Sequence, residues 1–339
     1  MAAEHHAPIV SRRTFVQGAG VAGLGLLAGC GRLPWQVQSP AKAYAVGFLV
    51  PFPLPVSGTW EGTAFIQALR EYGWIEGENI VIEYRSAQGR WDRLPDLAAE
   101  LVGLPVDVLV AFGPAIRPAK NATSTTPIIM VNAANPVANG LVESLAHPGG
   151  NITGVTFGEG FELGAKRLSL LQEAIPSISR VLVIQERGNG AYVQDTRRAA
   201  RTLDISLRWV TVSSPAQFKT AFDIAVSDHL DAIIPMDHAL LNNNNIYMVA
   251  LERQYQLPAM HPARGSVTFG GLMGYGINRP EQGRRAAYYV DRILTGTKPP
   301  DLPIEQPRTF DFAINLKTAQ ALGLTIPQHV LLQATEILQ

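Results

Sequence analysis

The sequence has a single cysteine, Cys30, in 339 residues and no excess of either charge. One cysteine rules out an internal disulfide, but a chain of this length can bury enough apolar surface to fold without one. Lysine plus arginine and aspartate plus glutamate number 28 each. This balance leaves no basic surface for a polyanion, and we expect no nucleic-acid partner.

The motifs of common enzymes are missing as well. The seven histidines show no H-x-x-x-H spacing, and the chain has no G-x-S-x-G elbow and no P-loop. Gly18 to Gly23 satisfies the G-x-G-x-x-G pattern, but a pair of arginines precedes it where a dinucleotide site requires a strand. We therefore expect no catalytic residue, no metal and no cofactor.

The first thirty residues resemble an export signal. Arg12-Arg13 precedes an uncharged run from Val16 to Gly29, typical of a twin-arginine signal peptide. The run is about fourteen residues long, short of the roughly 20 that a membrane-spanning helix needs. Leu27-Ala28-Gly29-Cys30 resembles a lipobox, which predicts lipidation of Cys30 after removal of residues 1–29. We expect a lipid-anchored protein of the periplasm or the outer face of the cytoplasmic membrane, with residues 30–43 as a linker.

Apolar runs and helical patterns alternate after the linker. In the first half, strands are predicted at 44–50, 79–85, 106–112 and 126–131, with helices at 61–72, 93–102 and 114–122 between them. In the second half, strands at 180–185, 206–212 and 231–236 alternate with helices at 192–203, 215–225 and 240–255. This rhythm indicates an α/β protein with two doubly wound parallel-sheet lobes. The glycine-rich segments 151–157 and 271–276 are predicted to connect them as hinge strands.

Several segments, spread over nearly the whole chain from residue 44 onward, resemble the ABC transporter substrate-binding family that includes tryptophan and phenylalanine binders. They are GWIEGEN at 73–79, RLPDLAAEL at 93–101, GLVESLAHPGGNITG at 140–154, GGLMGYG at 270–276, RAAYYVDRIL at 285–294 and INLKTAQALGLTIP at 314–327.

The resemblance implies a type I periplasmic-binding-protein fold with three hinge crossings, the third near 302–308. We expect residues 44–155 plus 274–304 in one lobe and 156–273 plus 305–339 in the other. It further implies a monomer that does no chemistry on its ligand and delivers a small polar molecule, an amino acid or a related carboxylate or heterocycle, to an ABC permease and ATPase. A lipoprotein that signals ligand binding to a membrane receptor is the alternative, because both uses depend on the same closure.

The ligand is expected beyond the carboxyl ends of the strands, where open α/β sheets bind small molecules. Two further candidates, Phe157 and Tyr275, lie on the predicted hinges. The full set of candidate residues is Ser57, Thr59, Gly113, Ala115, Asn132, Asn135, Phe157, Gln185, Arg187, Asn189, Asp237 and Tyr275. For Ser57, Thr59 and Asn189 a helix-capping role is favoured over a ligand contact, whereas Asp237 either caps a helix or meets a ligand amine. Phe157 and Tyr275 either stack on the ligand or pack the floor of the cleft.

Two positions depart from the family pattern. Asn135 stands where many members have aspartate, and an amide cannot pair with an ammonium group as a carboxylate does, so this change argues against an amino-acid ligand. Gly274 stands where the family often has serine, which removes a possible hydroxyl contact.

Overall fold

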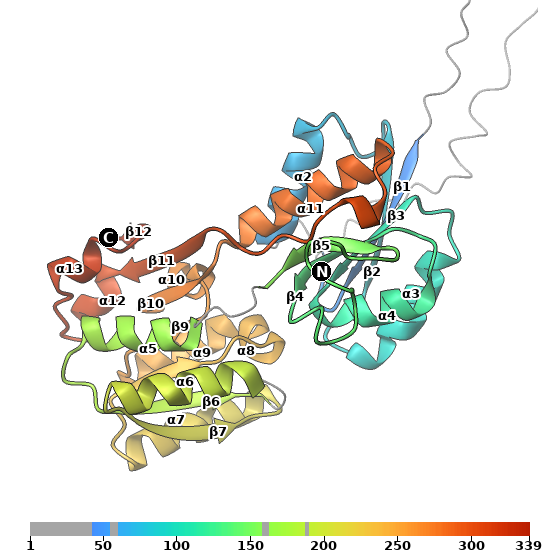
Figure 1. Cartoon of the computed structure of the whole chain (residues 1–339). Coiled ribbons are helices and arrows are strands. Elements are labelled where there is room, and N and C mark those ends of the chain that lie inside the picture. Colours follow the sequence, from blue (N-terminus) through green and yellow to red (C-terminus); the bar gives the residue numbers. More distant parts are fainter. Residues whose placement is uncertain (1–42, 55–59, 158–162, 187–189) are drawn as a thin grey trace, which may run out of the picture. The chain divides into compact units, whose positions relative to one another are not determined.

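The computed structural model describes residues 43–54, 60–157, 163–186 and 190–339, and within them it contains two α/β lobes, each built on its own sheet (Figure 1). The predicted signal peptide, Cys30 and nearly all of the linker lie outside the described residues.

The first lobe has a five-stranded sheet in the order β2-β1-β3-β4-β5, and all of its strand pairs are parallel. Its strands are β1 (Tyr44–Val50), β2 (Ile80–Ser86), β3 (Val108–Phe112), β4 (Ile128–Ala133) and β5 (Ile152–Thr156). A parallel sheet needs crossover helices, and these cover both of its faces.

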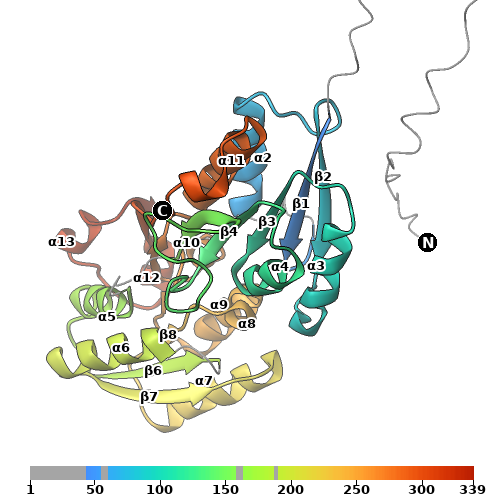
Figure 2. The same cartoon turned by 45° about the vertical axis from the view of Figure 1, so that its right-hand side comes forward.

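Side chains of β1 show how both faces are buried. Phe48 packs into a core with α2 (Trp60–Glu71) and α11 (Arg279–Leu294), whereas the adjacent Leu49 packs into a separate core with α3 (Leu94–Val102) and α4 (Ile116–Ala122). Successive residues of a strand point to opposite faces, so a strand covered on both sides is apolar throughout. In both views α2 and α11 lie side by side, although about 200 residues separate them in the chain (Figures 1 and 2).

The second lobe contains the strand orders β7-β6-β8 and β12-β11-β10-β9, which a parallel bridge between Ile233 and Ala259 joins. Its strands are β6 (Arg180–Gln185), β7 (Ser206–Thr211), β8 (Ala232–Pro235), β9 (Met260–His261), β10 (Met273–Ile277), β11 (Phe310–Asn315) and β12 (Glu336–Leu338). The pair β10–β11 is antiparallel, and the others are parallel.

Helices also cover both faces of the second sheet. One core joins its strands to α5 (Leu163–Ala174) and α6 (Gly190–Thr202), and another joins them to α7 (Phe218–Ser227) and α9 (Asn245–Tyr255). The shorter elements are η2 (Trp91–Arg93), η3 (Gly113–Ala115), η4 (Pro215–Gln217), α8 (Ala239–Asn243), α10 (Arg264–Thr268), η5 (Pro299–Asp301), α12 (Leu316–Ala321) and α13 (Gln328–Leu331). The single helix predicted at 240–255 is therefore two helices that meet at Asn244.

The predicted hinge strands are sheet strands, and the crossings follow them. Residues 152–156 form β5, the edge of the first sheet, and 273–277 form β10, inside the second. Gly274 to Ile277 thus belong to the second lobe, contrary to the boundary expected at 273/274. Glu305 pairs with Val155 of β5, so the third crossing begins after Glu305 rather than before it.

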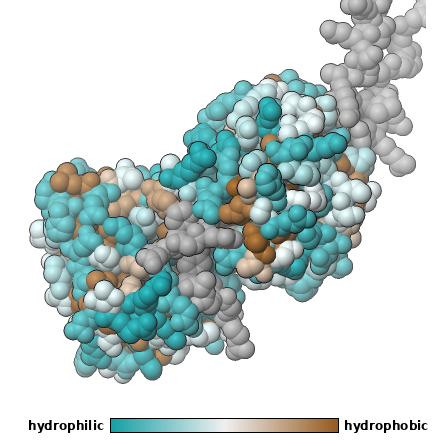
Figure 3. Space-filling model, viewed as in Figure 1, coloured by the Kyte–Doolittle hydropathy of each residue, from teal (hydrophilic) through white to brown (hydrophobic). Residues whose placement is uncertain are grey.

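The surface seen in Figure 3 is mostly hydrophilic, with smaller hydrophobic patches on both lobes. Among the described residues no helix combines the length and the apolar character needed to cross a bilayer. Many of the apolar side chains pack in the cores on the two faces of each sheet.

Candidate ligand-binding pocket

A pocket of about 570 Å³ lies where residues after β1, β2, β3 and β4 of the first lobe approach residues after β8 of the second. This is the size range of small-molecule sites. The side chains that give it its chemical character are Phe52, Glu61, Trp91, Phe112, Arg117, Asn132, Phe157, Asp237, His238, Asn242 and Arg279. The carboxyl ends of the strands thus meet at one site, as the parallel topology requires.

Aromatic side chains form much of the apolar wall. Phe52 follows β1 and meets Phe112, the last residue of β3, edge to face with ring centroids 5.8 Å apart. Trp91 follows β2, is 38% exposed, and stacks on His238 of the second lobe with centroids 5.5 Å apart and an interplanar angle of 29°. Aromatic side chains can stack on a planar ligand or meet it edge to face.

Asn132 places an unsatisfied acceptor at the pocket. Its backbone has a φ of +58°, the left-handed conformation that asparagine tolerates better than most residues. The register of β4 against β5 shifts between Met130 and Ala133, so Asn132 lies at an irregularity that redirects its side chain. Its Oδ1 is buried and has no hydrogen-bond partner among the described residues. A buried acceptor of this kind favours a ligand that brings a donor.

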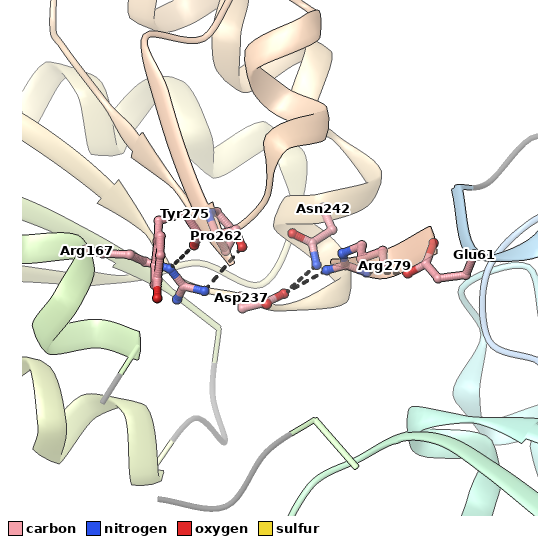
Figure 4. A network of polar contacts seen from close by, with 7 residues as sticks. All are labelled: Glu61, Arg167, Asp237, Asn242, Pro262, Tyr275 and Arg279. Atoms are coloured by element: carbon pink, nitrogen blue, oxygen red, sulfur yellow. Dashed lines mark hydrogen bonds and ion pairs between the residues drawn. The ribbon is translucent and has the colours of Figure 1, made fainter. Parts of the chain in front are cut away.

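Two carboxylates and one guanidinium of the pocket lining form a network (Figure 4). Arg279 Nη1 lies 2.9 Å from Glu61 Oε1, and its Nη2 lies 3.3 Å from Asp237 Oδ1. Asn242 Nδ2 donates to the same Asp237 oxygen at 2.8 Å. The side chains of Glu61 and Asp237 are only 9% and 7% exposed, so their charges need partners close by.

Packing between α2 and α11 positions this network. A Cβ on Gly283 would lie 2.1 Å from the carbonyl oxygen of Glu61, so the two helices approach closely only because residue 283 is glycine. Arg279 is one turn before Gly283, at the start of α11, and Glu61 is in the first turn of α2. Asn278 caps α11 by accepting from Glu281 N at 2.8 Å, which fixes the backbone beside Arg279.

Further contacts frame the pocket. His238 Nδ1 is paired with the carboxylate of Glu186, which follows β6. Arg117, on α4, is exposed and donates to the carbonyl oxygen of Asn139. Of the described residues, no group of three or more His, Cys, Asp or Glu side chains is placed to hold a metal ion.

The structure brings four of the predicted residues to this pocket: Gly113, Asn132, Phe157 and Asp237. Asp237 does not cap α8, because His238 occupies that position without a capping bond. Ser57, Thr59, Arg187 and Asn189 lie outside the described residues.

Four other candidates are not among the lining residues of the pocket. Ala115 is fully buried in the first lobe, and Gln185 Nε2 donates to Thr211 Oγ1 at 3.2 Å. The backbone carbonyl oxygen of Asn135 accepts from Asn139 N at 2.9 Å. The carboxylates that line the pocket belong to Glu61 and Asp237.

Tyr275 packs within the second lobe. Its ring stacks on Phe310 with centroids 6.0 Å apart, and its carbonyl oxygen accepts from Arg167 Nε at 2.8 Å (Figure 4). Burial raises the pKa of its phenol. Gly274, beside it, has no room for the family serine, because a Cβ there would lie 2.6 Å from the carbonyl oxygen of Ala263.

Sequence reasoning missed Trp91, Glu61, Arg117 and Arg279. Trp91 follows the second predicted strand, so the rule used for the other strands also points to it. Glu61, Arg117 and Arg279 are helical residues, and ordinary helix-surface charges give no signal that separates them from others. Only the packing of α2, α4 and α11 brings them to the pocket.

Comparison with known proteins finds one matching family and a related binding protein. The family described as ABC transporter substrate binding protein matches residues 59–338. A relative from Clostridioides difficile, named tyrosine-binding protein, is 26% identical over an alignment of 319 residues that covers 90% of each chain.

Two solved structures resemble the chain closely. A conserved domain protein from Vibrio cholerae is 26% identical with a TM-score of 0.78, over 87% of this chain and 100% of that one. An ABC domain in complex with L-Trp from Streptococcus pneumonia is 22% identical with a TM-score of 0.78, over 88% and 100%. The expected α/β fold with two sheet-based lobes is confirmed.

Proposed function

The chain belongs to the ABC transporter substrate-binding protein family, whose members bind solutes outside the cytoplasm and are not enzymes, and we propose that this member binds an aromatic L-amino acid in the pocket beside Asn132. One observation carries the proposal: a single pocket combines four aromatic rings with side chains of both charges. The tyrosine-binding relative and the structure that holds L-Trp support it.

The physical fit has two parts. An aromatic amino acid is a zwitterion with a flat apolar side chain, and burying either of its charges is costly unless a counter-charge or hydrogen bond meets it. Asn132, Asp237 and Glu61 offer acceptors for the ammonium group, and Arg117 and Arg279 offer donors for the carboxylate. Phe52, Trp91, Phe112 and Phe157 supply the surface for the ring.

A panel of ligands tests this assignment. Purified protein is heated with L-tryptophan, L-tyrosine or L-phenylalanine, with L-alanine, and with a sugar. A ligand at a hundred times its Kd stabilises the folded state by about 2.7 kcal/mol. We expect a clear rise in Tm with at least one aromatic amino acid and none with alanine. A rise with the sugar alone would overturn the assignment.

We further propose that the chain is a lipoprotein that passes its ligand to a membrane permease. The support is the sequence of the signal and the lipobox at Cys30. Cys30→Ala is expected to move the protein from the membrane fraction to the soluble fraction, and replacement of Arg12-Arg13 by two lysines is expected to block export. Persistence of the Cys30→Ala variant in membranes contradicts lipidation.

Delivery to a permease is tested separately by uptake of the labelled amino acid into cells with and without this chain. Lower uptake without the chain is the expected result. Unchanged uptake would favour the signalling lipoprotein instead, since the same closure serves both purposes.

A further inference from the structure

Arg279 differs from the other charged residues of the pocket in touching two carboxylates. Glu61 belongs to α2 of the first lobe, and Asp237 follows β8 of the second. The arginine side chain is 22% exposed, more than either acid. Figure 4 shows the guanidinium reaching toward both carboxylates.

The charges along the described lining of the pocket cancel. Glu61 and Asp237 are negative, and Arg117 and Arg279 are positive. A set of described lining residues with two charges of each sign suits a ligand whose own charges also cancel. Removal of one arginine would leave an excess negative charge, which suits a ligand with a net positive charge.

We propose that Arg279 is a specificity-determining residue that makes the pocket select an amino acid over the corresponding amine. This inference rests on the proposed function and names the residue that sets the charge class of the ligand. By holding Glu61 and Asp237, Arg279 reduces their joint pull on an ammonium group. Binding then requires a second contribution from the ligand, its carboxylate, which a decarboxylated amine lacks.

The test measures one ratio in each protein, the Kd of tryptamine divided by the Kd of L-tryptophan, by isothermal titration calorimetry. The paired ligands for tyrosine are tyramine and L-tyrosine. Any inactive fraction in a preparation affects both ligands equally, so the ratio reports selectivity independently of fold quality. In Arg279→Gln we expect the ratio to fall at least tenfold, which corresponds to about 1.4 kcal/mol. Arg279→Lys keeps the charge and is expected to hold the ratio within about threefold of wild type.

A matched control and an opposite variant sharpen the test. Arg208→Gln also removes an arginine from an ion pair, with Asp228 at 3.0 Å, but Arg208 does not line the pocket, so its ratio should equal that of wild type. Glu61→Gln leaves an excess positive charge and should raise the ratio, so the inference stays testable if Arg279→Gln does not fold.

The outcomes distinguish the selectivity role of Arg279 from the proposed binding of an aromatic amino acid. If wild type binds L-tryptophan or L-tyrosine but the ratio in Arg279→Gln stays within twofold of wild type, the role of Arg279 is overturned and the proposed function stands. If wild type binds no aromatic amino acid, the proposed function and this inference fall together. A fall of the same size in the Kd ratio of Arg208→Gln would also overturn the inference, because the loss of one positive charge anywhere in the protein would then explain the lower ratio.

Discussion

Replacement of Asn132 by glycine should weaken ligand binding without lowering the stability of the ligand-free protein. The Oδ1 of Asn132 is buried and without a partner among the described residues. An unsatisfied buried acceptor costs about 1–3 kcal/mol of folding free energy. A φ of +58° excludes alanine as a neutral substitute, whereas glycine adopts this conformation without steric cost.

The magnitude follows from these terms. Asn132→Gly removes the unsatisfied acceptor, and the extra backbone freedom of glycine costs about 0.5–1 kcal/mol. The ligand-free variant should therefore be as stable as wild type or up to about 2.5 kcal/mol more stable. For a chain of this size each kcal/mol corresponds to roughly 2–4 °C in Tm. Loss of a charge-assisted hydrogen bond to the ammonium group should weaken ligand binding by about 1.5–3 kcal/mol, which is roughly 10- to 150-fold.

The role of Asn132 is tested by two measurements on the same preparation. These are thermal unfolding without ligand and calorimetric titration with L-tryptophan or L-tyrosine. The reasoning predicts weaker binding with an unchanged or higher Tm. A variant that unfolds several degrees earlier and binds as wild type does would refute it, and would show that Asn132 serves the fold of the β4 irregularity rather than the ligand.

Three other substitutions follow from the same geometry. Asp237→Asn keeps the shape of the side chain but removes its charge, so calorimetry should show at least about tenfold weaker amino-acid binding, and binding within twofold would argue against the contact. Trp91→Ala removes a ring at the pocket and should cost about 0.5–1.5 kcal/mol of binding free energy, with no loss if the ring only faces solvent. Gly283→Ala forces α11 away from Glu61 and should destabilise the protein by about 1–3 kcal/mol in chemical unfolding. In Gly103→Ala the added Cβ would lie 3.4 Å from its nearest neighbours, and this control should change stability by less than about 1 kcal/mol.

Much of the fold could be predicted because each lobe repeats a simple pattern. The strands predicted at 44–50 and 180–185 have those bounds in the structure, and the others differ by one or two residues at their ends. The crossings were harder to place. Residues 152–156 and 273–277 look alike as glycine-punctuated strands, and which sheet each joins is decided by long-range pairing that local pattern does not encode.

The pocket could be predicted only where it depends on topology. Gly113 and Asp237 follow strands, Asn132 lies at the carboxyl end of β4, and the carboxyl ends of parallel strands converge whatever the details of packing. Glu61 and Arg279 depend instead on the close approach of two helices at Gly283. In the sequence Gly283 resembles any helical glycine, and its consequence appears only when α2 lies against it.

The most direct test of the account is a crystal structure of the protein grown with L-tryptophan or L-tyrosine. We predict the aromatic ring among Phe52, Trp91 and Phe112, with the ammonium nitrogen within about 3.2 Å of Asn132 Oδ1 or of the Asp237 carboxylate. The same amino acid bound elsewhere, with the pocket beside Asn132 holding only solvent, would contradict the central claim.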